Sequence, residues 1–327
     1  MGVRLIDVEP RPDVFAAVMA TGIVSVSGAD HRYPWISDTL DGVALLAFVV
    51  IVVLVLRRVG RVGFPYPLSD IDVVVRLFTF VAACAVLGAR FQAHPVAICT
   101  MTALAWLAWI LLMPLTIRGT RAQGGAGSRD QARGVWELVS VATSSLAIVT
   151  AHLAMIWRDG ALFVIGLATW LLAIGLYGVI TWLILWRAAV APTADLWQPD
   201  SWILMGGLAI ATLAGDRLHF AALTIVTKDW VLTAVRSVTV ATWVVATLWI
   251  PPLVYATVRH LRVRFTGAWW AMVFPVGMYS ATTSAMTTET RWQPFQTLST
   301  VAFWIAFASW LLVASAAAAT FARARSR

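Results

Sequence analysis

Long apolar stretches recur along the whole 327-residue chain, and they constrain its fold more than any other feature. A membrane-spanning helix needs about 20 mainly apolar residues. Ten such stretches have approximate limits 14–29, 39–56, 75–91, 95–117, 135–157, 160–187, 201–218, 231–258, 267–287 and 297–320. Since 60% of the residues are hydrophobic and only 12% are charged, a soluble protein and a disordered chain are both excluded. We predict an all-α polytopic membrane protein, with ten transmembrane helices in one domain (1–327) of five helical hairpins.

The basic residues indicate how the spans are oriented. If the N-terminus is cytoplasmic, 17 of the 24 Lys and Arg fall on cytoplasmic segments and 6 fall on the opposite side. Cytoplasmic loops carry an excess of these residues, so both termini are expected in the cytoplasm, with the protein in the plasma or inner membrane. Anionic lipid accounts for the net charge of +8 without nucleic acid. A flexible cytoplasmic loop is expected at Arg118–Gly134, and no cleavable signal peptide is expected.

The odd-numbered and even-numbered spans differ in composition. Odd spans are richer in Gly, Ala, Ser and Thr, which let helices approach closely and whose hydroxyls need partners or water. Mid-span tryptophans occur only in even spans, at Trp106, Trp109, Trp170, Trp182, Trp243, Trp249, Trp304 and Trp310. Bulky side chains of this kind suit contact with lipid. We therefore predict an inner ring of five odd helices, either solid or enclosing a narrow pore, within an outer ring of five even helices.

Small and hydroxyl-bearing residues of the odd spans are the candidates for a pore wall. In the first span Thr21, Ser25 and Gly28 share one helical face, which equally suits close packing between helices. The residues predicted to line a pore are Thr21, Gly22, Ser25, Ser144, Gly206, Gly277 and Thr282.

The ninth span contains an interior proline, Pro275. Proline lacks an N–H, and its ring clashes with the carbonyl four residues earlier, so the helix is expected to bend at this position. Phe274 is the large side chain beside the bend. Its ring either packs like an ordinary core residue or closes a narrow pore.

Ionisable residues in the spans are few, and they are costly at membrane depth. His152, inside the fifth span, either packs with a hydrogen-bonding partner or contacts a proton or anion. Arg236, near the outer end of the eighth span, either reaches the headgroups or attracts anions to a pore mouth. No carboxylate is expected at mid-span, which argues against an Asp/Glu proton relay. Cys84 and Cys99 form no metal-binding pattern, so we expect no metal and no cofactor.

Two short motifs resemble one family of membrane proteins. Met19-Ala-Thr-Gly-Ile23 and Trp269-Trp-Ala-x-x-Phe-Pro275 are similar to motifs of the tellurite-resistance/C4-dicarboxylate transporter family, which includes plant slow anion channels. The resemblance implies ten helices in five hairpins, a pore inside the odd helices, Phe274 as its gate, and a homotrimer with one pore per subunit. Channel-type members have a Gly-Ile-Pro-Leu-Gly-like stretch where this chain has Thr21-Gly-Ile-Val-Ser25. The chain therefore resembles the malate and sulfite transporters more closely.

We expect the protein to let small anions cross the membrane, with tellurite resistance as an incidental outcome. The candidate substrates are a C4-dicarboxylate such as malate, sulfite (through sulfite export), and chloride or nitrate. One alternative is a non-transporting sensor or partner protein with a solid inner ring, which the small residues of the odd spans disfavour. The other is an intramembrane enzyme. Its nearest catalytic constellation, His152 with Ser144 or Ser145, has no carboxylate to orient the base, so we do not expect an enzyme.

Overall fold

Helices make up all the regular secondary structure that the computed structural model describes, in residues 11–190, 198–225, 228–260, 269–290 and 292–325. The predicted cytoplasmic termini, residues 1–10 and 326–327, lie outside these ranges. In chain order the helices are α1 (Ala16–Asp30), α2 (Pro34–Val62), α3 (Ile71–Arg90), α4 (Pro95–Gln131), the 3-10 helix η1 (Gly134–Glu137), α5 (Leu138–Trp157), α6 (Gly160–Val190), the 3-10 helix η3 (Pro199–Trp202), α7 (Ile203–Ile225), α8 (Asp229–His260), α9 (Trp270–Thr290) and α10 (Gln293–Arg325).

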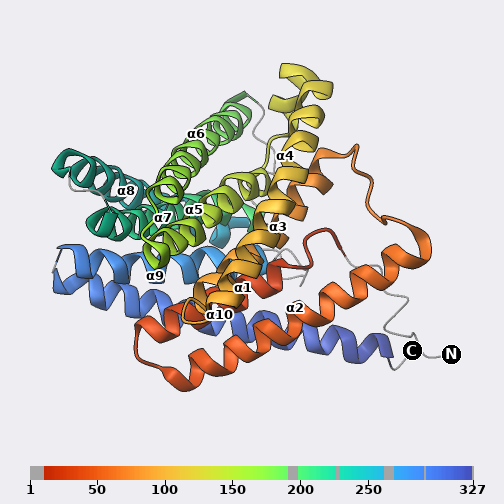
Figure 1. Ribbon diagram of the computed structural model, residues 1–327. Helices are drawn as coiled ribbons and strands as arrows, with labels where there is room; N and C mark the ends of the chain where they lie inside the picture. Colours follow the sequence, from red (N-terminus) through yellow and green to blue (C-terminus); the bar gives the residue numbers. More distant parts are fainter. Residues whose placement is uncertain (1–10, 191–197, 226–227, 261–268, 291, 326–327) are drawn as a thin grey trace.

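Each odd-numbered helix packs against the even-numbered helix that follows it (Figure 1). Short connections make this pairing direct, since residues 31–33 join α1 to α2 and residues 91–94 join α3 to α4. Pro34 and Pro95 begin α2 and α4. Proline suits the first helical position because its fixed φ matches the helix and its missing N–H would have no helical partner there.

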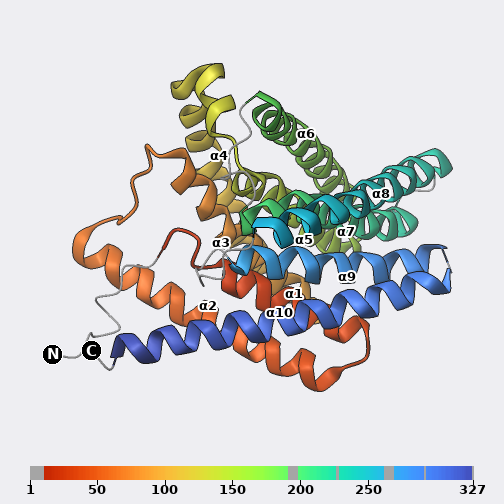
Figure 2. The same cartoon turned by 180° about the vertical axis from the view of Figure 1, so that it is seen from behind.

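A second set of contacts joins the odd helices to one another. α1 contacts α3, α3 contacts α5, α5 contacts α7, α7 contacts α9, and α9 contacts α1. Figures 1 and 2 show these five helices in the middle of the molecule, with the even helices around them. The most apolar windows of α3, α5 and α7 are 67–89% buried inside the protein, against 17–39% for those of the even helices. The even helices therefore present most of the surface that lipid could cover.

Eight helices are long and apolar enough to cross a membrane, and α1 and α9 are the described α-helices outside that set. α1 is apolar but has only 15 residues, and α9 is rich in Ser and Thr. Both pack against several other helices, so the hydroxyls of α9 meet protein rather than lipid. Ten spans were predicted, and composition supports eight of them. That α1 and α9 also cross the membrane stays a prediction.

The prediction of a loop at Arg118–Gly134 was wrong, because α4 extends to Gln131. Gly124 has φ 68° and ψ 172°, which bends the helix, and a further helical stretch follows (Figure 1). Glycine adopts positive φ at little cost. Gln123 donates a side-chain hydrogen bond to Gln131 at 2.9 Å, and Ser128 donates to the Thr120 carbonyl at 3.3 Å. These bonds hold the end of α4 against its own preceding turn.

Hydrogen bonds from tryptophans on even helices to hydroxyls on odd helices connect the two sets of helices. An indole N–H can only donate, and a threonine hydroxyl accepts. The pairs are Trp106 with Thr150, Trp109 with Thr143, Trp243 with Thr283, and Trp310 with Thr21, at distances of 2.9–3.2 Å. Part of the hydroxyl content of the odd helices therefore serves helix packing.

Candidate functional site

Two small cavities lie among the odd helices. The first, which we call the Arg76 cavity, has a volume of about 20 Å³ and is lined by Asp13, Ala16, Met19, Arg76, Thr79, Val135, Leu138, Asp200, Ile203, Ala271 and Phe274. The second, the Met278 cavity, has a volume of about 30 Å³ and is lined by Ile23, Val26, Ala85, Val86, Ala89, Ser145, Ile148, Ile210, Leu213 and Met278. A cavity of this size holds one or two water molecules at most. α1, α3, α5, α7 and α9 contribute to both.

The two cavities are related by a constant offset of seven residues on every one of these five helices. The paired positions are Ala16 and Ile23, Met19 and Val26, Thr79 and Val86, Leu138 and Ser145, Ile203 and Ile210, and Ala271 and Met278. At 1.5 Å of rise per residue, this offset is a displacement of about 10 Å. The five helices therefore run in the same direction around a common axis, and the cavities are two levels on it.

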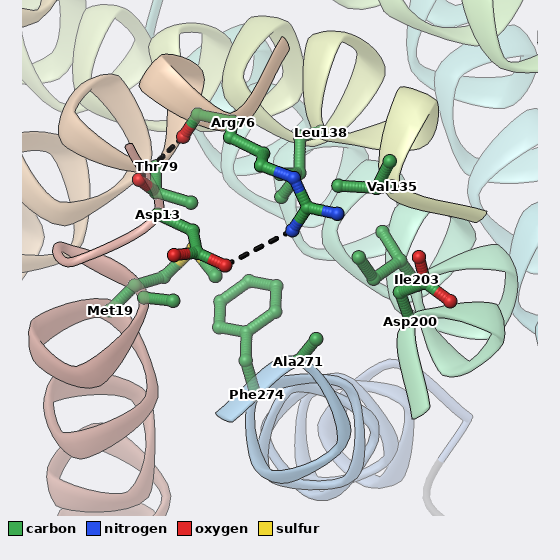
Figure 3. Close-up of a pocket in the computed structure, with 11 residues that line it drawn as sticks. Asp13, Met19, Arg76, Thr79, Val135, Leu138, Asp200, Ile203, Ala271 and Phe274 are labelled. Atoms are coloured by element: carbon green, nitrogen blue, oxygen red, sulfur yellow. Dashed lines mark hydrogen bonds and ion pairs between the residues drawn. The ribbon is translucent and has the colours of Figure 1, made fainter. Parts of the chain in front are cut away.

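Phe274 is part of the wall of the Arg76 cavity. α9 carries it three residues after Ala271 and four residues before Met278, so the three side chains share one helical face. Its side chain has no exposed surface, and Figure 3 shows its ring extending from α9 toward Asp13 and Arg76. Pro275 follows on a neighbouring face, where a Cβ added to Gly206 of α7 would lie 2.9–3.2 Å from three Pro275 atoms.

An ion pair stands opposite the Phe274 ring (Figure 3). Arg76 Nη1 lies 3.0 Å from Asp13 Oδ2, and the two side chains are 23% and 10% exposed. Asp13 also pairs with Arg11, whose Nε lies 3.3 Å from Asp13 Oδ1. The hydroxyl of Thr79 donates to the Arg76 carbonyl at 2.8 Å, which helps to hold this turn of α3.

Further charged groups surround the same end of the odd helices. Arg133 Nη2 lies 2.6 Å from Asp72 Oδ2, and Trp136 Nε1 donates to Asp72 Oδ1 at 2.8 Å. Asp200 is buried at the cavity wall. Tyr66 donates its hydroxyl to the Arg11 carbonyl at 3.4 Å. Burial, and secondly the Asp13 charge, raise the pKa of Tyr66 to about 12, so this hydroxyl keeps its proton at neutral pH.

The glycines predicted to line a pore lie at contacts between neighbouring odd helices. A Cβ on Gly22 of α1 would meet Val86 of α3 at 2.6 Å, and one on Gly277 of α9 would meet Ile23 of α1 at 3.1 Å. A Cβ on Gly206 of α7 would likewise meet Pro275 of α9 at 2.9 Å. None of the three is among the residues that line the two cavities. Their missing side chains instead allow the odd helices to approach closely.

The hydroxyl residues predicted to line a pore are also absent from the two cavity walls. Thr21 donates to the Ala17 carbonyl at 2.7 Å and accepts the Trp310 indole N–H. Ser25 donates to the Ser37 carbonyl of α2 at 2.8 Å. Thr282 donates to the Met278 carbonyl of its own helix at 3.0 Å. Ser144 is fully buried in α5, and its hydroxyl has no hydrogen-bond partner within the part of the chain that the structure describes.

The two predicted ionisable candidates lie away from the Arg76 cavity. His152 is buried near the end of α5, and its Nδ1 has no hydrogen-bond partner among the described residues. Arg236 is exposed on the peripheral helix α8. The structure therefore does not bring either of them together with Phe274.

Asp13, Arg76 and Asp200 are site residues that the sequence reasoning missed. Arg76 was counted with the cytoplasmic cations of residues 57–76, although the third span was predicted to begin at residue 75. α3 begins at Ile71, and Asp70 caps it by accepting a hydrogen bond from the Asp72 N–H at 2.9 Å. Aspartate before an apolar run is an N-cap signal, so Asp70 was the signal that places Arg76 in the second turn of α3.

Comparison with known proteins decides the family. The model of the voltage-dependent anion channel family, SLAC1, matches residues 11–318, which cover nearly the whole chain and all five odd helices. The chain belongs to this family. Two proteins from Mycobacterium tuberculosis, strains CDC 1551 / Oshkosh and ATCC 25618 / H37Rv, are each described as an uncharacterized membrane protein and are 31% identical over 127 residues. The match covers 36% of this chain and 62% of each relative, so it spans less than two thirds of their length.

Membership of the voltage-dependent anion channel family confirms the resemblance to the tellurite-resistance/C4-dicarboxylate transporters. The chain is thus a helical membrane protein from a family of anion transport proteins rather than enzymes. The Arg76 cavity, with Phe274 in its wall, and the Met278 cavity are the candidate site for that activity.

Proposed function

We propose that small anions cross the membrane along the axis shared by α1, α3, α5, α7 and α9. The observation that carries this proposal is the seven-residue offset between the two cavities on all five helices. A linear path needs helices that run in parallel around one axis, and the offset describes that arrangement. All ten helices span the bilayer as five hairpins in this proposal, with the even helices facing lipid and both termini in the cytoplasm.

Phe274 is the gate of this path in our proposal. Its buried ring forms part of the wall of the Arg76 cavity, which has room for about one water molecule, so an anion cannot pass while the ring is in place. An apolar constriction also blocks ions because it excludes their hydration water. Pro275 fixes the position of this turn of α9 by packing against Gly206 of α7.

The substrate class is small inorganic anions or dicarboxylates, and we propose malate, sulfite, nitrate and chloride as the candidates. The malate and sulfite subgroup is preferred because of the Thr21–Ser25 stretch in the first helix. The assembly is proposed to be a homotrimer with a separate path in each subunit, in the cell membrane.

Reconstitution of the full chain into liposomes tests the path. Flux of the four candidate anions is measured against protein-free liposomes, and at least one anion is expected to cross faster in the presence of protein. Met278→Trp places a larger side chain in the Met278 cavity, so it is expected to slow that flux. Leu171→Trp is the matched control, because Leu171 is 53% exposed on α6.

Two outcomes would contradict the proposal. No anion crosses faster with protein than without it, or Met278→Trp leaves flux unchanged in a protein that is as stable as the wild type. The melting temperature in detergent, measured for both variants, separates a blocked path from a misfolded protein.

A further inference from the structure

Arg76 is the one cation among the residues that line the Arg76 cavity. Asp13 and Asp200 are the acidic residues of the same wall. Arg11 is bound to Asp13, and Arg133 is bound to Asp72 at the same end. Among the described residues of these pairs and of the cavity wall, three arginines face the three acidic residues Asp13, Asp72 and Asp200. An anion that arrives there therefore meets no net positive charge, although a guanidinium lies directly beside the proposed gate.

The Asp13 carboxylate takes the position that an anion would take. A guanidinium binds carboxylates and other oxyanions through parallel N–H···O bonds, which a single-atom halide cannot accept in the same way. Asp13 Oδ2 already lies 3.0 Å from Arg76 Nη1. A cavity of about 20 Å³ leaves room for one water molecule, so a further anion has no space beside Arg76 while Asp13 is there.

Asp13 has a second cationic partner, Arg11. Arg11 contacts both carboxylate oxygens: its Nε lies 3.3 Å from Oδ1, and its Nη2 donates to Oδ2 at 3.4 Å. Its side chain is 55% exposed. Asp13 lies in the turn that precedes α1, whereas Arg76 lies within α3. A rotation of the Asp13 side chain would therefore release Arg76 and leave the carboxylate paired with Arg11 at the protein surface.

We propose that Arg76 is a docking site for an oxyanion, and that Asp13 is a tethered carboxylate that occupies this site until the oxyanion displaces it. This inference rests on the proposed anion path and deepens it. The ligand class is a carboxylate, nitrate or sulfite, with chloride disfavoured because it offers no second oxygen to the guanidinium. Both groups then control access to the Arg76 cavity: Asp13 occupies the guanidinium that an anion would bind, and the Phe274 ring blocks the anion sterically.

The test uses the full chain, with nitrate and chloride as probes. Asp13→Asn is expected to lower the nitrate concentration that half-saturates flux by about tenfold, because the competing carboxylate is gone. Arg76→Gln is expected to raise this nitrate concentration. In a protein that already carries Arg76→Gln, adding Asp13→Asn is expected to have no further effect. Arg133→Gln is the matched control, since it removes a cation that pairs with Asp72 at the same end without removing the docking group or a partner of Asp13.

Arg76→Gln removes the charge that pairs with Asp13 and could impair folding, so the conservative variant Arg76→Lys is measured as well. It keeps the charge but loses the planar fork of donors, so nitrate affinity is expected to fall by a larger factor than chloride affinity. Equal losses for the two anions would overturn the oxyanion assignment. An equal effect of Arg133→Gln and Arg76→Gln, or an undiminished effect of Asp13→Asn when Arg76→Gln is also present, would overturn the docking site.

Nitrate binding to the detergent-purified protein separates this inference from the proposed function. Binding that depends on Arg76 and is strengthened by Asp13→Asn, with no flux in liposomes, supports the docking site and contradicts the anion path. Flux that does not depend on either residue supports the path and contradicts the docking site.

Discussion

At the scale of single residues, glycines determine how closely the odd helices approach. Gly22 lies against Val86, and Gly206 lies against Pro275, at distances that leave no space for a Cβ. Other glycines have no such role: a Cβ on Gly178 of α6 would meet nothing within 4 Å. The same residue type is therefore a packing requirement at one position and only a weak helix former at another.

Gly206→Ala and Gly178→Ala are expected to change stability in opposite directions. The Cβ at position 206 would lie 2.9 Å from a Pro275 ring carbon, so overpacking is expected to cost about 1–3 kcal/mol. At position 178 the Cβ enters open space, and the better helix propensity of alanine is expected to add up to about 1 kcal/mol. Melting temperatures in detergent check this. Equal shifts for the two variants would show that the α7–α9 contact is not tightly packed.

Sequence reasoning could identify single residues only where local chemistry marks them. Phe274 and Pro275 stand out because Pro275 is the interior proline of an odd helix, whereas the other interior prolines of the described helices lie in α4 and α8. Arg76 and Asp13 are separated by 63 residues, and their pairing depends on how α3 and the start of α1 pack together. Thr21 was assigned to a pore wall from its helical face, but its hydroxyl accepts the Trp310 indole, a partner that no spacing within the first helix could reveal.

At the scale of elements, the junction of α1, α9 and α10 is held by one histidine. His31 Nε2 lies 2.9 Å from Ser299 Oγ of α10 and 3.1 Å from Ser280 Oγ of α9. Ser27 donates to the same Ser280 hydroxyl at 2.7 Å. Burial lowers the pKa of His31 from its ordinary value of 6.5, and a hydrogen bond with Ser299 opposes part of that shift.

This junction predicts a loss of stability in acid. The unfolded chain takes up a proton on His31 at a higher pH than the folded protein does, so the stabilising contribution is complete above pH 6.5 and is lost as the pH falls below it. Between about pH 7.5 and pH 5.5 the melting temperature of His31→Gln is therefore expected to fall less than that of the wild type. His94→Gln, at an exposed position, is expected to follow the wild type. Parallel curves for all three proteins would contradict this role for His31.

The end of α4 allows a direct test of orientation. The excess of cations predicts that residues 118–134 are cytoplasmic. Ala122 is exposed in this helical end, whereas Ser128 is buried, so Ala122→Cys is the suitable probe. An impermeant thiol reagent is expected to label it only after the cells are opened. Rapid labelling in intact cells would invert the proposed topology, and Cys84→Ala/Cys99→Ala in the same protein removes the natural thiols.

The helices themselves could be predicted well, but their ends could not. Apolar stretches of about 20 residues mark helices because each backbone polar group must bond within its own segment in a bilayer. α4 was predicted to end near residue 117, since the following residues are polar and glycine-rich. Hydrogen bonds between its own side chains, such as Gln123 to Gln131, carry the helix further. Those bonds depend on the bend at Gly124. The sequence has Gly124, Gly125 and Gly127 in the same stretch, so it does not indicate which glycine adopts the bend.

At the scale of the whole molecule, charge inside the helical core is sparse, which bears on coupling to protons. Glu137 is fully buried and accepts a hydrogen bond from Thr181 of α6 at 2.7 Å. Neither Glu137 nor His152 lines the two cavities. We therefore expect chloride or nitrate flux in liposomes to continue when an added ionophore collapses the pH gradient. Strict dependence on the gradient would contradict this expectation and direct attention to these two residues.

The central claim is that the Phe274 ring blocks an anion path on the axis of the odd helices. Phe274→Ala removes the ring and keeps a good helix former, whereas Phe274→Leu keeps much of the volume. If Phe274 served only core packing, truncation would cost about 3–5 kcal/mol of stability without raising flux. Flux in liposomes and melting temperature are therefore measured together for each variant.

The account predicts that Phe274→Ala raises anion flux severalfold in a protein that still assembles, and that Phe274→Leu raises it less. A stable Phe274→Ala protein whose anion flux equals that of the wild type would contradict the account.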